Sequence, residues 1–325
     1  MSSWSGGGGA PRPPPRLGYF QALPEGTFDS ADSSTVTVVT AYYEMKSKYP
    51  PAKYREWIQR FLETLTCPIV FFTDAATLPF LEACPRASSS VEFVVIPRAE
   101  WKANDPGHFP AGFWESQWAM DPEQGIHSAE LYKVWYEKKE FVLRAIARNP
   151  FGSTKFVWTD AGIMRNTAFA ALLGARYPVA ARIPSDRMML LNYWPFTRSD
   201  EHVHIVRGMS IKGGGIDKPR LMGNILAGSV ASWQRWSELY DDAVGRYRQA
   251  GVFIGKDQTI FMTLVLERKE FHSLLDLKKI APEPWFYLLL YLGVSDRVWK
   301  ILRSPRADRE KWTYERFVQE SSSAG

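Results

Sequence analysis

Short apolar runs alternate with amphipathic stretches over the first third of the chain. The runs Thr35–Ala41, Pro68–Thr73 and Val91–Ile96 are rich in β-branched and aromatic residues, which is typical of buried strands. Between the first two, apolar residues recur at i, i+3, i+4 and i+7 from Ile58 and predict a helix, and Leu78–Ala83 predicts a shorter one. This alternation of strands and helices predicts a parallel sheet with right-handed crossovers.

The pattern is interrupted between residues 98 and 128, a stretch rich in Trp, Gly and Pro that we expect to be a long loop able to cover a site. A helix is then predicted from Ala129 to about Arg148, ended by Asn149-Pro150-Phe151-Gly152. Its apolar face is expected to consist of Leu131, Val134, Trp135, Val142, Ala145 and Ile146. A strand over Met188–Leu191 and helices over residues 233–247 and 257–267 follow. The chain therefore has the pattern of an α/β protein.

The most informative segment is the apolar run Lys155–Thr159, which predicts a strand buried on both faces and ends on Asp160-Ala161-Gly162. Open α/β sheets bind their ligands beyond the carboxyl ends of the strands, so Asp160 is well placed for chemistry. Gly162 allows the backbone to turn or a ligand to approach closely. An aspartate at this position can equally cap the next helix. Residues 155–162 alone do not distinguish a catalytic role of Asp160 from a capping role.

Composition bounds the domain organisation. The 325 residues suffice for one large domain, which we expect to span residues 35–303. Residues 1–34 are rich in Gly, Pro and Ser and are predicted to be disordered, and residues 304–325 form a charged C-terminal tail. The net charge of +5 is not concentrated in a compact Lys/Arg block. This pattern does not indicate nucleic-acid binding, but it suits attraction of anionic small molecules.

Cysteine usage and hydropathy indicate the compartment. Cys67 and Cys84 are the only cysteines, so a disulfide framework and a Cys-rich metal site are excluded, and two unpaired thiols are expected. The N-terminus lacks the apolar core of a signal peptide. The most apolar run, Trp285–Val294, is shorter than the ~20 residues that span a bilayer. We expect a soluble, cytoplasmic protein with no membrane span.

Several common site motifs are missing from the sequence. No glycine loop of the dinucleotide or P-loop type follows the first strand, and Gly213–Gly215 is more typical of a flexible loop than of a phosphate cradle. The five histidines are scattered; His202 and His204 would share one side of a strand, which more often means a solvated edge than a metal site.

The order of three segments resembles a known family. Leu131–Lys138 precedes Asn149-Pro150-Phe151, and Phe156–Gly162 follows, as in the bacterial HtrL/YibB protein family. Later, Gly223–Ser229 precedes a long helix and then Gly255–Ile260, which is similar to the second half of GT-A glycosyltransferases. The resemblance covers about residues 35 to 295 and implies a GT-A-like, Rossmann-like fold, with a mostly parallel central sheet flanked by helices.

The resemblance also implies a function, the transfer of a sugar from a nucleotide-sugar donor to a glycan or protein acceptor. Many GT-A enzymes hold Mn²⁺ or Mg²⁺ through an Asp-X-Asp motif, and Asp160 matches its first Asp, which makes it the candidate metal ligand. Gly162 stands where the second Asp would be, and this departure puts metal dependence in doubt. Lys138, Arg165 or Lys256 can supply positive charge for the diphosphate instead, although a helical lysine is usually a solvated charge.

Further site residues follow from the same resemblance. Thr40 and Tyr42 correspond to positions that hold the base and ribose, and Asp74 is expected to contact a ribose hydroxyl or to cap a helix. Trp158 and Gly162 adjoin the donor. Asp257 and Gln258 correspond to an Asp-Gln pair near the acceptor, where Asp257 can act as general base or stabilise positive charge on the sugar.

Asp257 has an alternative reading as a helix N-cap. If it serves the site, its carboxylate should lie roughly 8–15 Å from that of Asp160, leaving room for a sugar. Two other functions remain open: a non-catalytic domain that binds a nucleotide sugar or glycan, and a nucleotidyltransferase on the same kind of sheet.

Overall fold

The computed structural model describes residues 34–173, 176–196, 200, 220–276 and 284–302. The two predicted tails, apart from Ser34, lie outside this described part, as do Gly213–Gly215 and the pair His202 and His204.

The described strands form one sheet of seven strands in the order β3-β2-β1-β4-β6-β5-β7, in which β6 alone runs antiparallel to its neighbours. The strands are β1 (Val36–Tyr42), β2 (Ile69–Thr73), β3 (Val91–Val95), β4 (Lys155–Thr159), β5 (Met188–Asn192), β6 (Leu221–Ser229) and β7 (His272–Asp276). The predicted α/β class is confirmed, and the first three strands and β5 match the sequence to within one residue. The small-residue segment from Gly223 belongs to a strand that the sequence analysis did not predict.

The order of the strands reverses at β1. The chain runs from β1 outward to β2 and β3, and β4 then returns to the other side of β1, where Val39 pairs with Trp158. Such a switch point separates the carboxyl ends of the two strands and leaves a crevice between the loops that follow them. Tyr42 ends β1 and Asp160 follows β4, so both lie at this crevice.

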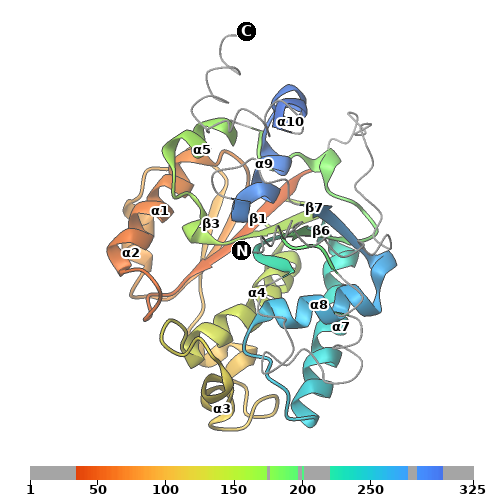
Figure 1. The fold of residues 1–325 in the computed structure, drawn as a ribbon. Helices are drawn as coiled ribbons and strands as arrows, with labels where there is room; N and C mark the ends of the chain where they lie inside the picture. The colour runs from red at the N-terminus through yellow and green to blue at the C-terminus, as the bar shows by residue number, and fades with distance from the viewer. Residues whose placement is uncertain (1–33, 174–175, 197–199, 201–219, 277–283, 303–325) are drawn as a thin grey trace, which may run out of the picture.

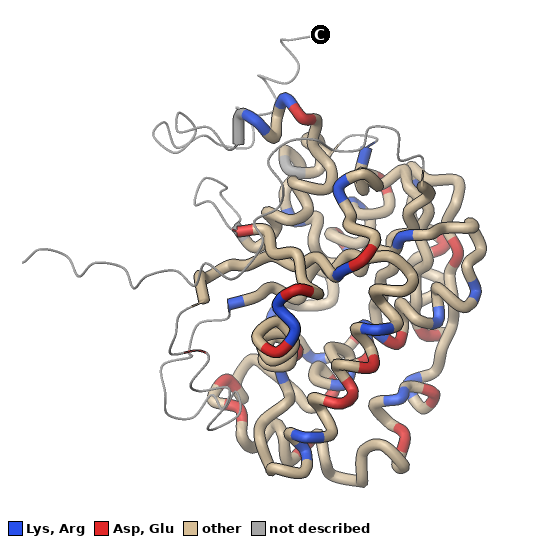
Figure 2. Tube along the Cα trace, turned by 90° about the vertical axis from the view of Figure 1, so that its right-hand side faces the viewer, with Lys and Arg blue, Asp and Glu red and all other residues tan. Residues whose placement is uncertain are grey.

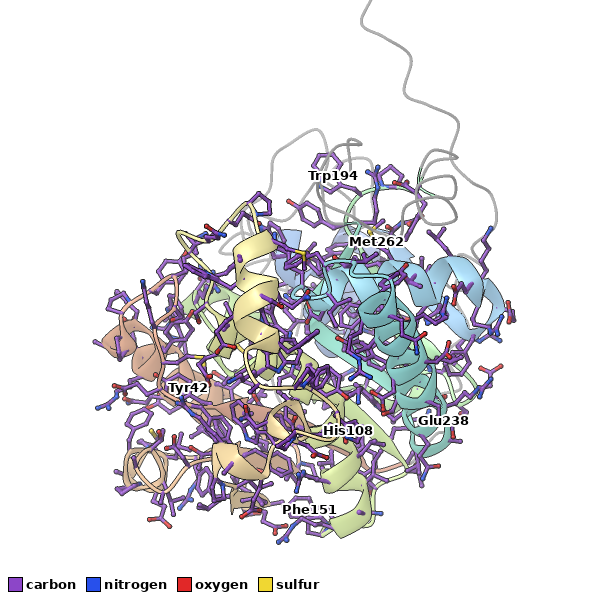
Figure 3. All side chains as sticks on the ribbon, turned by 90° about the horizontal axis from the view of Figure 1, so that it is seen from below. Tyr42, His108, Phe151, Trp194, Glu238 and Met262 are labelled. Atoms are coloured by element: carbon purple, nitrogen blue, oxygen red, sulfur yellow. The ribbon has the colours of Figure 1, made fainter. Side chains whose placement is uncertain are left out.

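Helices cover both faces of the sheet, giving three layers (Figure 1). One face carries α1 (Pro51–Thr64), α2 (Leu78–Ala83), α5 (Thr167–Leu173), α9 (Tyr287–Gly293) and α10 (Asp296–Leu302). The other face carries α3 (Phe113–Met120), α4 (Ala129–Arg148), α7 (Val230–Gln249) and α8 (Asp257–Glu267). Figure 3 shows side chains filling the space between these layers, with Met262 buried in α8 and Glu238 on the exposed side of α7.

Alternation along the strands divides the core in two. Val157 in β4 packs with the α1 and α9 side, whereas its neighbours Phe156 and Trp158 pack with the α4 and α7 side. Successive strand side chains point to opposite faces, so an apolar run without alternation is what a doubly covered strand requires.

Residues 98–128 differ from the expected loop. They contain two 3-10 turns, η1 (Arg98–Glu100) and η2 (Lys102–Asn104), and the helix α3. Trp101 and Trp114 are buried, and the Trp114 indole N–H donates to the carbonyl of Ala103 at 2.7 Å. The expected loop is thus partly helical, because these aromatic side chains anchor it in the core, whereas Ile126 and His127 at its end line the pocket described below.

The predicted apolar face of α4 adjoins the pocket in its first half and the core in its second. Val142 and Ala145 are buried, whereas Leu131, Val134 and Trp135 are only partly buried and line a pocket. The buried side of α4 instead includes consecutive charged residues: Glu137, Lys138 and Lys139.

Glu137 and Lys139 tie α4 to neighbouring elements. The Glu137 carboxylate accepts hydrogen bonds from the backbone N–H groups of Lys102 and Ala103, both at 3.2 Å, and so holds η2. Lys139 forms an ion pair of 2.8 Å with Asp241 of α7. Desolvation raises the pKa of Glu137 to about 7, although the hydrogen bond from Ala103 acts in the opposite direction.

At the surface, segments with Lys or Arg lie beside segments with Asp or Glu in the view of Figure 2. Arg246, for example, pairs with Asp242 at 3.0 Å and with Glu267 at 2.8 Å. Cys67 and Cys84 are free thiols, as predicted. No helix in the described ranges has the length and apolarity needed to cross a bilayer.

Candidate functional site

A cavity of about 560 Å³ opens at the switch point of the sheet. Its walls come from the ends of β1 and β4, the start of β6, one face of α4 and the first residues of α8. The α4 face is the stripe Leu131, Val134, Trp135 and Lys138, which the helical repeat places in one row. The volume is in the range of small-molecule sites, which combine apolar walls with a few polar groups.

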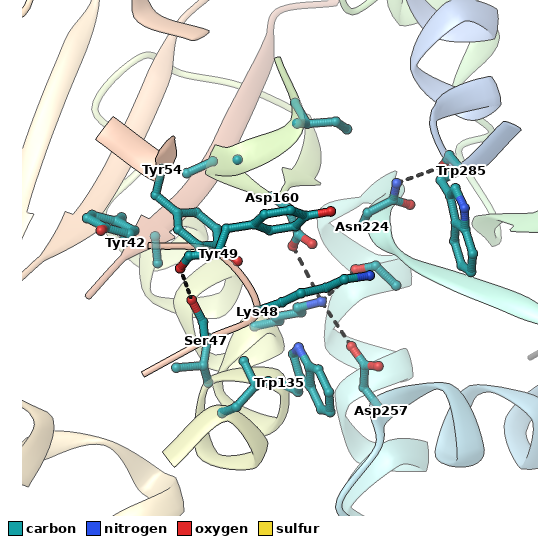
Figure 4. A pocket seen from close by; sticks show the side chains of 18 of the residues that line it. Tyr42, Ser47, Lys48, Tyr49, Tyr54, Trp135, Asp160, Asn224, Asp257 and Trp285 are labelled. Atoms are coloured by element: carbon teal, nitrogen blue, oxygen red, sulfur yellow. Dashed lines mark hydrogen bonds and ion pairs between the residues drawn. The ribbon is translucent and has the colours of Figure 1, made fainter. Parts of the chain in front are cut away.

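Three charged side chains meet at the centre of this pocket (Figure 4). The Lys138 Nζ lies 2.9 Å from Asp257 Oδ2 and 3.4 Å from Asp160 Oδ1, and it donates to the Gly223 carbonyl at 2.7 Å. The separation of the two carboxylate oxygens cannot exceed the sum of 2.9 and 3.4 Å, so the expected spacing of Asp160 and Asp257 was too long. Both acids had been expected to flank a sugar, but they flank an ammonium group.

The three members differ in exposure. The side chains of Lys138 and Asp257 are each 6% exposed, whereas that of Asp160 is 41% exposed and faces the pocket.

The three charges shift one another's pKa values. Desolvation raises the pKa of Asp160, while Lys138 and the Trp158 N–H, which donates at 2.7 Å, act in the opposite direction. Desolvation lowers the pKa of Lys138, but Asp160 and Asp257 outweigh it and the net shift is upward. The group therefore carries a net negative charge whose accessible part is Asp160.

Backbone geometry fixes the two acids. The Asp160 N–H donates to the Asn224 carbonyl at 2.9 Å, which extends the pairing of β4 with β6. Asp257 is the first residue of α8; the cap is Lys256, and no side-chain cap hydrogen bond is present, so the capping reading of Asp257 was wrong. A Cβ at Gly223 would lie 2.6 Å from Asp257 Oδ2, so this position has to be glycine for the carboxylate to fit.

Gly162 lines the pocket and is closely packed on its α1 side. A Cβ there would lie 3.2 Å from the Tyr54 ring and 3.5 Å from Trp57. Gly162, which breaks the Asp-X-Asp pattern, thus packs against side chains of α1.

One end of the pocket is made of tyrosines: Tyr42, Tyr49 and Tyr54 (Figure 4). The Tyr42 and Tyr54 rings stack at 6.0 Å, and burial raises the pKa of Tyr42 to about 12, so its hydroxyl stays protonated and can donate. The Arg165 guanidinium lies 4.6 Å from the centre of the Trp57 ring.

Two of the pocket's basic residues are uncompensated. Within the described residues, neither Arg165 nor Lys48 has an acidic partner, in contrast to Lys138. An anion that entered the pocket would meet these two cations first, because the hydrogen bonds of Lys138 are already directed at protein oxygens.

Most of the residues predicted from the sequence meet at this pocket. Tyr42, Lys138, Trp158, Asp160, Gly162, Arg165, Asp257 and Gln258 all line it. Gln258 Nε2 donates to the Leu221 carbonyl at 2.8 Å, which fixes its amide beside Asp257.

Three candidates lie elsewhere. Thr40 is fully buried and not part of the lining. Asp74 accepts a hydrogen bond from the Thr77 N–H at 2.9 Å and so serves a turn before α2; the N-cap of α2 is Thr77, so Asp74 neither lines the pocket nor caps the helix. Lys256 pairs with Glu123 instead of facing the pocket.

A second group of ligand-type residues lies beside the pocket. Ligand atoms of Asp121, Glu123 and His127 lie within 4.8 Å of one another, an arrangement that can hold a metal ion. His127 also lines the pocket, and its Nδ1 lies 2.7 Å from buried Asp121, which further accepts from the Tyr132 hydroxyl at 2.5 Å. The Lys256 ammonium contacts both acids, which lowers the need for a further cation there.

Sequence reasoning did not find Lys48, Tyr49, His127, Asn224 or Trp285 as pocket residues. Lys48 and Tyr49 follow β1 within a few residues, and position after a strand end was the signal that could have found them. Asn224 belongs to β6, and Trp285 belongs to the 3-10 turn η7 (Pro284–Phe286). The positions of these elements beside the pocket depend on the pairing of the strands, which no local sequence pattern encodes.

Comparison of the chain with protein-family models and with curated proteins finds no match.

Proposed function

We propose that this protein is a glycosyltransferase that takes a sugar from a nucleotide-sugar donor, on a GT-A-like fold. The observation that carries the proposal is the group of Asp160, Lys138 and Asp257 at the switch point of the sheet. This group lies between an aromatic end that also carries Lys48 and Arg165 and a second aromatic end at Trp285. The order of the motifs along the chain, which resembles the HtrL/YibB family, supports the same class.

The tyrosine end suits the donor nucleotide. Aromatic rings stack on a base, and the Tyr42 hydroxyl can donate to it or to the ribose. Lys48 and Arg165 supply the charge that a diphosphate requires. Lys138 instead holds the two acids together and compensates part of their charge.

Asp160 is the acid that we assign to the reaction. Its exposed carboxylate and raised pKa suit a group that accepts a proton from an acceptor hydroxyl. Asp257 is almost fully enclosed and its Oδ2 contacts Lys138, so we assign it to positioning Lys138 and, through it, Asp160.

A non-catalytic domain that binds a nucleotide sugar or glycan is the second candidate. The lack of a second Asp at Gly162, where a Cβ would require the Tyr54 ring to give way, favours it over a metal-dependent enzyme.

The test is a pair of turnover assays, each with EDTA or Mn²⁺. One uses a panel of nucleotide sugars and measures released nucleoside diphosphate, and the other uses nucleoside triphosphates with sugar 1-phosphates and measures released pyrophosphate. We expect diphosphate release by the wild type and a loss of at least about 100-fold in Asp160→Asn, since removal of a general base typically costs 10²–10⁴-fold. Asp242→Asn is the matched control, because Asp242 is an exposed acid of α7 outside the pocket.

The outcomes separate the candidates. Pyrophosphate release from a nucleoside triphosphate and a sugar 1-phosphate would indicate a nucleotidyltransferase. Donor binding without turnover would leave the non-catalytic candidate, and full activity in Asp160→Asn would refute the assigned role.

A further inference from the structure

We propose that Trp285 and Asn224 form a subsite for an uncharged pyranose ring of a glycan acceptor, next to Asp160. This inference rests on the proposed function and extends it to the class of acceptor. The two residues lie at the end of the pocket opposite the tyrosines (Figure 4).

Trp285 presents an exposed aromatic surface to the pocket. The residue lines the pocket and is 44% exposed, whereas most indoles of this chain are buried. Tyr193 stacks on it, with ring centres 4.6 Å apart and an interplanar angle of 20°. One side of the indole is therefore supported by protein, while part of the ring stays available to a ligand.

Asn224 connects this surface to the reacting acid. Its Nδ2 donates to the Trp285 carbonyl at 2.7 Å, and its own carbonyl accepts from the Asp160 N–H at 2.9 Å. A ring lying on Trp285 is thus placed beside Asp160 by a single intervening residue.

The same asparagine offers an unused acceptor. Asn224 Oδ1 is buried and has no hydrogen-bond partner among the residues that the structure describes, and its residue lines the pocket. A buried acceptor without a partner costs free energy, which a hydroxyl donor from a ligand would recover.

These features together fit a sugar. A pyranose ring has a face of C–H groups that packs on an indole, and a rim of hydroxyls that donate to Asn224 Oδ1 and to the Asp160 carboxylate. The two carboxylates of Asp160 and Asp257 lie beside one ammonium group, that of Lys138, so negative charge is in excess and disfavours an anionic ring at this end. Nucleotide phosphates would instead be drawn toward Lys48 and Arg165.

The experiment is a ¹⁹F NMR titration of protein labelled with 5-fluorotryptophan, in which Trp285→Phe assigns the Trp285 resonance. The probes are maltose, cellobiose and lactose at millimolar concentration. We expect at least one of them to shift the Trp285 resonance saturably. Trp285→Ala and Asn224→Ala should each raise the Kd of that disaccharide at least about tenfold, as measured by isothermal titration calorimetry because Trp285→Ala lacks the reporting resonance. Trp118→Ala is the matched control, because Trp118 is 40% exposed but outside the pocket lining, and its Kd should change less than about twofold.

Three results would overturn the subsite: none of the disaccharides shifts the resonance, the Kd in Trp285→Ala is unchanged, or uridine shifts the Trp285 resonance in their place. Thermal shifts with UDP and GDP, measured in parallel, test the donor end separately. If the disaccharide binds and no nucleotide does, the subsite stands, but the proposed transfer fails.

Discussion

Lys138 is a basic residue on a helix, a position where sequence reasoning expects a solvated charge. Its side chain instead extends from α4 to β6, where the ammonium group contacts two carboxylates and a backbone carbonyl. A buried ion pair adds little net stability when it is complete, because desolvation of the charges offsets their attraction. Removal of one partner is costly, because the remaining charges stay in place without compensation.

Lys138→Met should therefore destabilise the protein by about 3–5 kcal/mol, since Asp160 and Asp257 would face each other without a cation. Urea unfolding followed by circular dichroism measures this change. Lys53→Met is the control, because Lys53 forms an exposed ion pair on α1 and its removal should have little effect. Equal effects of the two substitutions would show that the Lys138 contacts do not hold the site.

At the scale of elements, the bounds of most strands and helices could be read from the sequence, because apolar runs and helical periodicity record which faces are covered. Helix α4 was predicted with the bounds that it has, yet its orientation was not. The apolar residues Leu131, Val134 and Trp135 were predicted to share one face, and this part of the face lines the pocket, while charged Glu137 and Lys139 are buried. Periodicity gives a face, but it does not tell whether a ligand site or the core lies against it.

The buried Glu137 gives α4 a testable pH dependence. Its pKa is about 7 in the folded protein and 4.5 in its ordinary environment, so between these values the folded state binds more protons than the unfolded state. Stability from this group is present below pH 4.5 and is lost as the pH rises toward 7. The loss is about 3 kcal/mol if one pKa unit corresponds to 1.36 kcal/mol.

Glu137→Gln does not titrate, so its free energy of unfolding relative to wild type should rise by up to about 3 kcal/mol between pH 4.5 and pH 8. Denaturant unfolding at several pH values measures the difference. A pH-independent cost from the altered hydrogen bonds to Lys102 and Ala103 does not affect this trend. Glu63→Gln, on the exposed side of α1, is the control. A wild-type-minus-variant difference that does not depend on pH would contradict the burial of a charged Glu137.

At the scale of the whole molecule, the sheet brings together residues that are remote along the chain. Tyr42, Asp160, Asn224, Asp257 and Trp285 all line one pocket. The rule that ligands lie beyond strand ends could locate Tyr42 and Asp160 from the sequence. Asn224 could not be located, because it depends on the antiparallel insertion of β6 between β4 and β5, a pairing set by the whole fold.

The N-terminal segment should be dispensable for this fold, because its Gly/Pro/Ser composition offers little apolar area. Deletion of residues 1–33 keeps Thr35, whose carbonyl accepts from the Thr154 N–H at 3.2 Å, and should change the melting temperature by less than about 2 °C. Deletion of residues 1–38 also removes buried Val36 and Val38 and should unfold the protein. A fall of many degrees in the shorter deletion would show that the segment packs on the domain.

The most direct test of the account is calorimetric titration of the wild type with UDP and GDP, with UMP and GMP for comparison. We predict that one of the diphosphates binds more tightly than its monophosphate, and that Lys48→Ala and Arg165→Ala each weaken it at least about tenfold, because these cations have no acidic partner within the described residues. Arg235→Ala, an exposed arginine of α7 outside the pocket, should bind like the wild type. If neither diphosphate binds the wild type, or if both pocket variants keep its affinity, the pocket is not a nucleotide-sugar site.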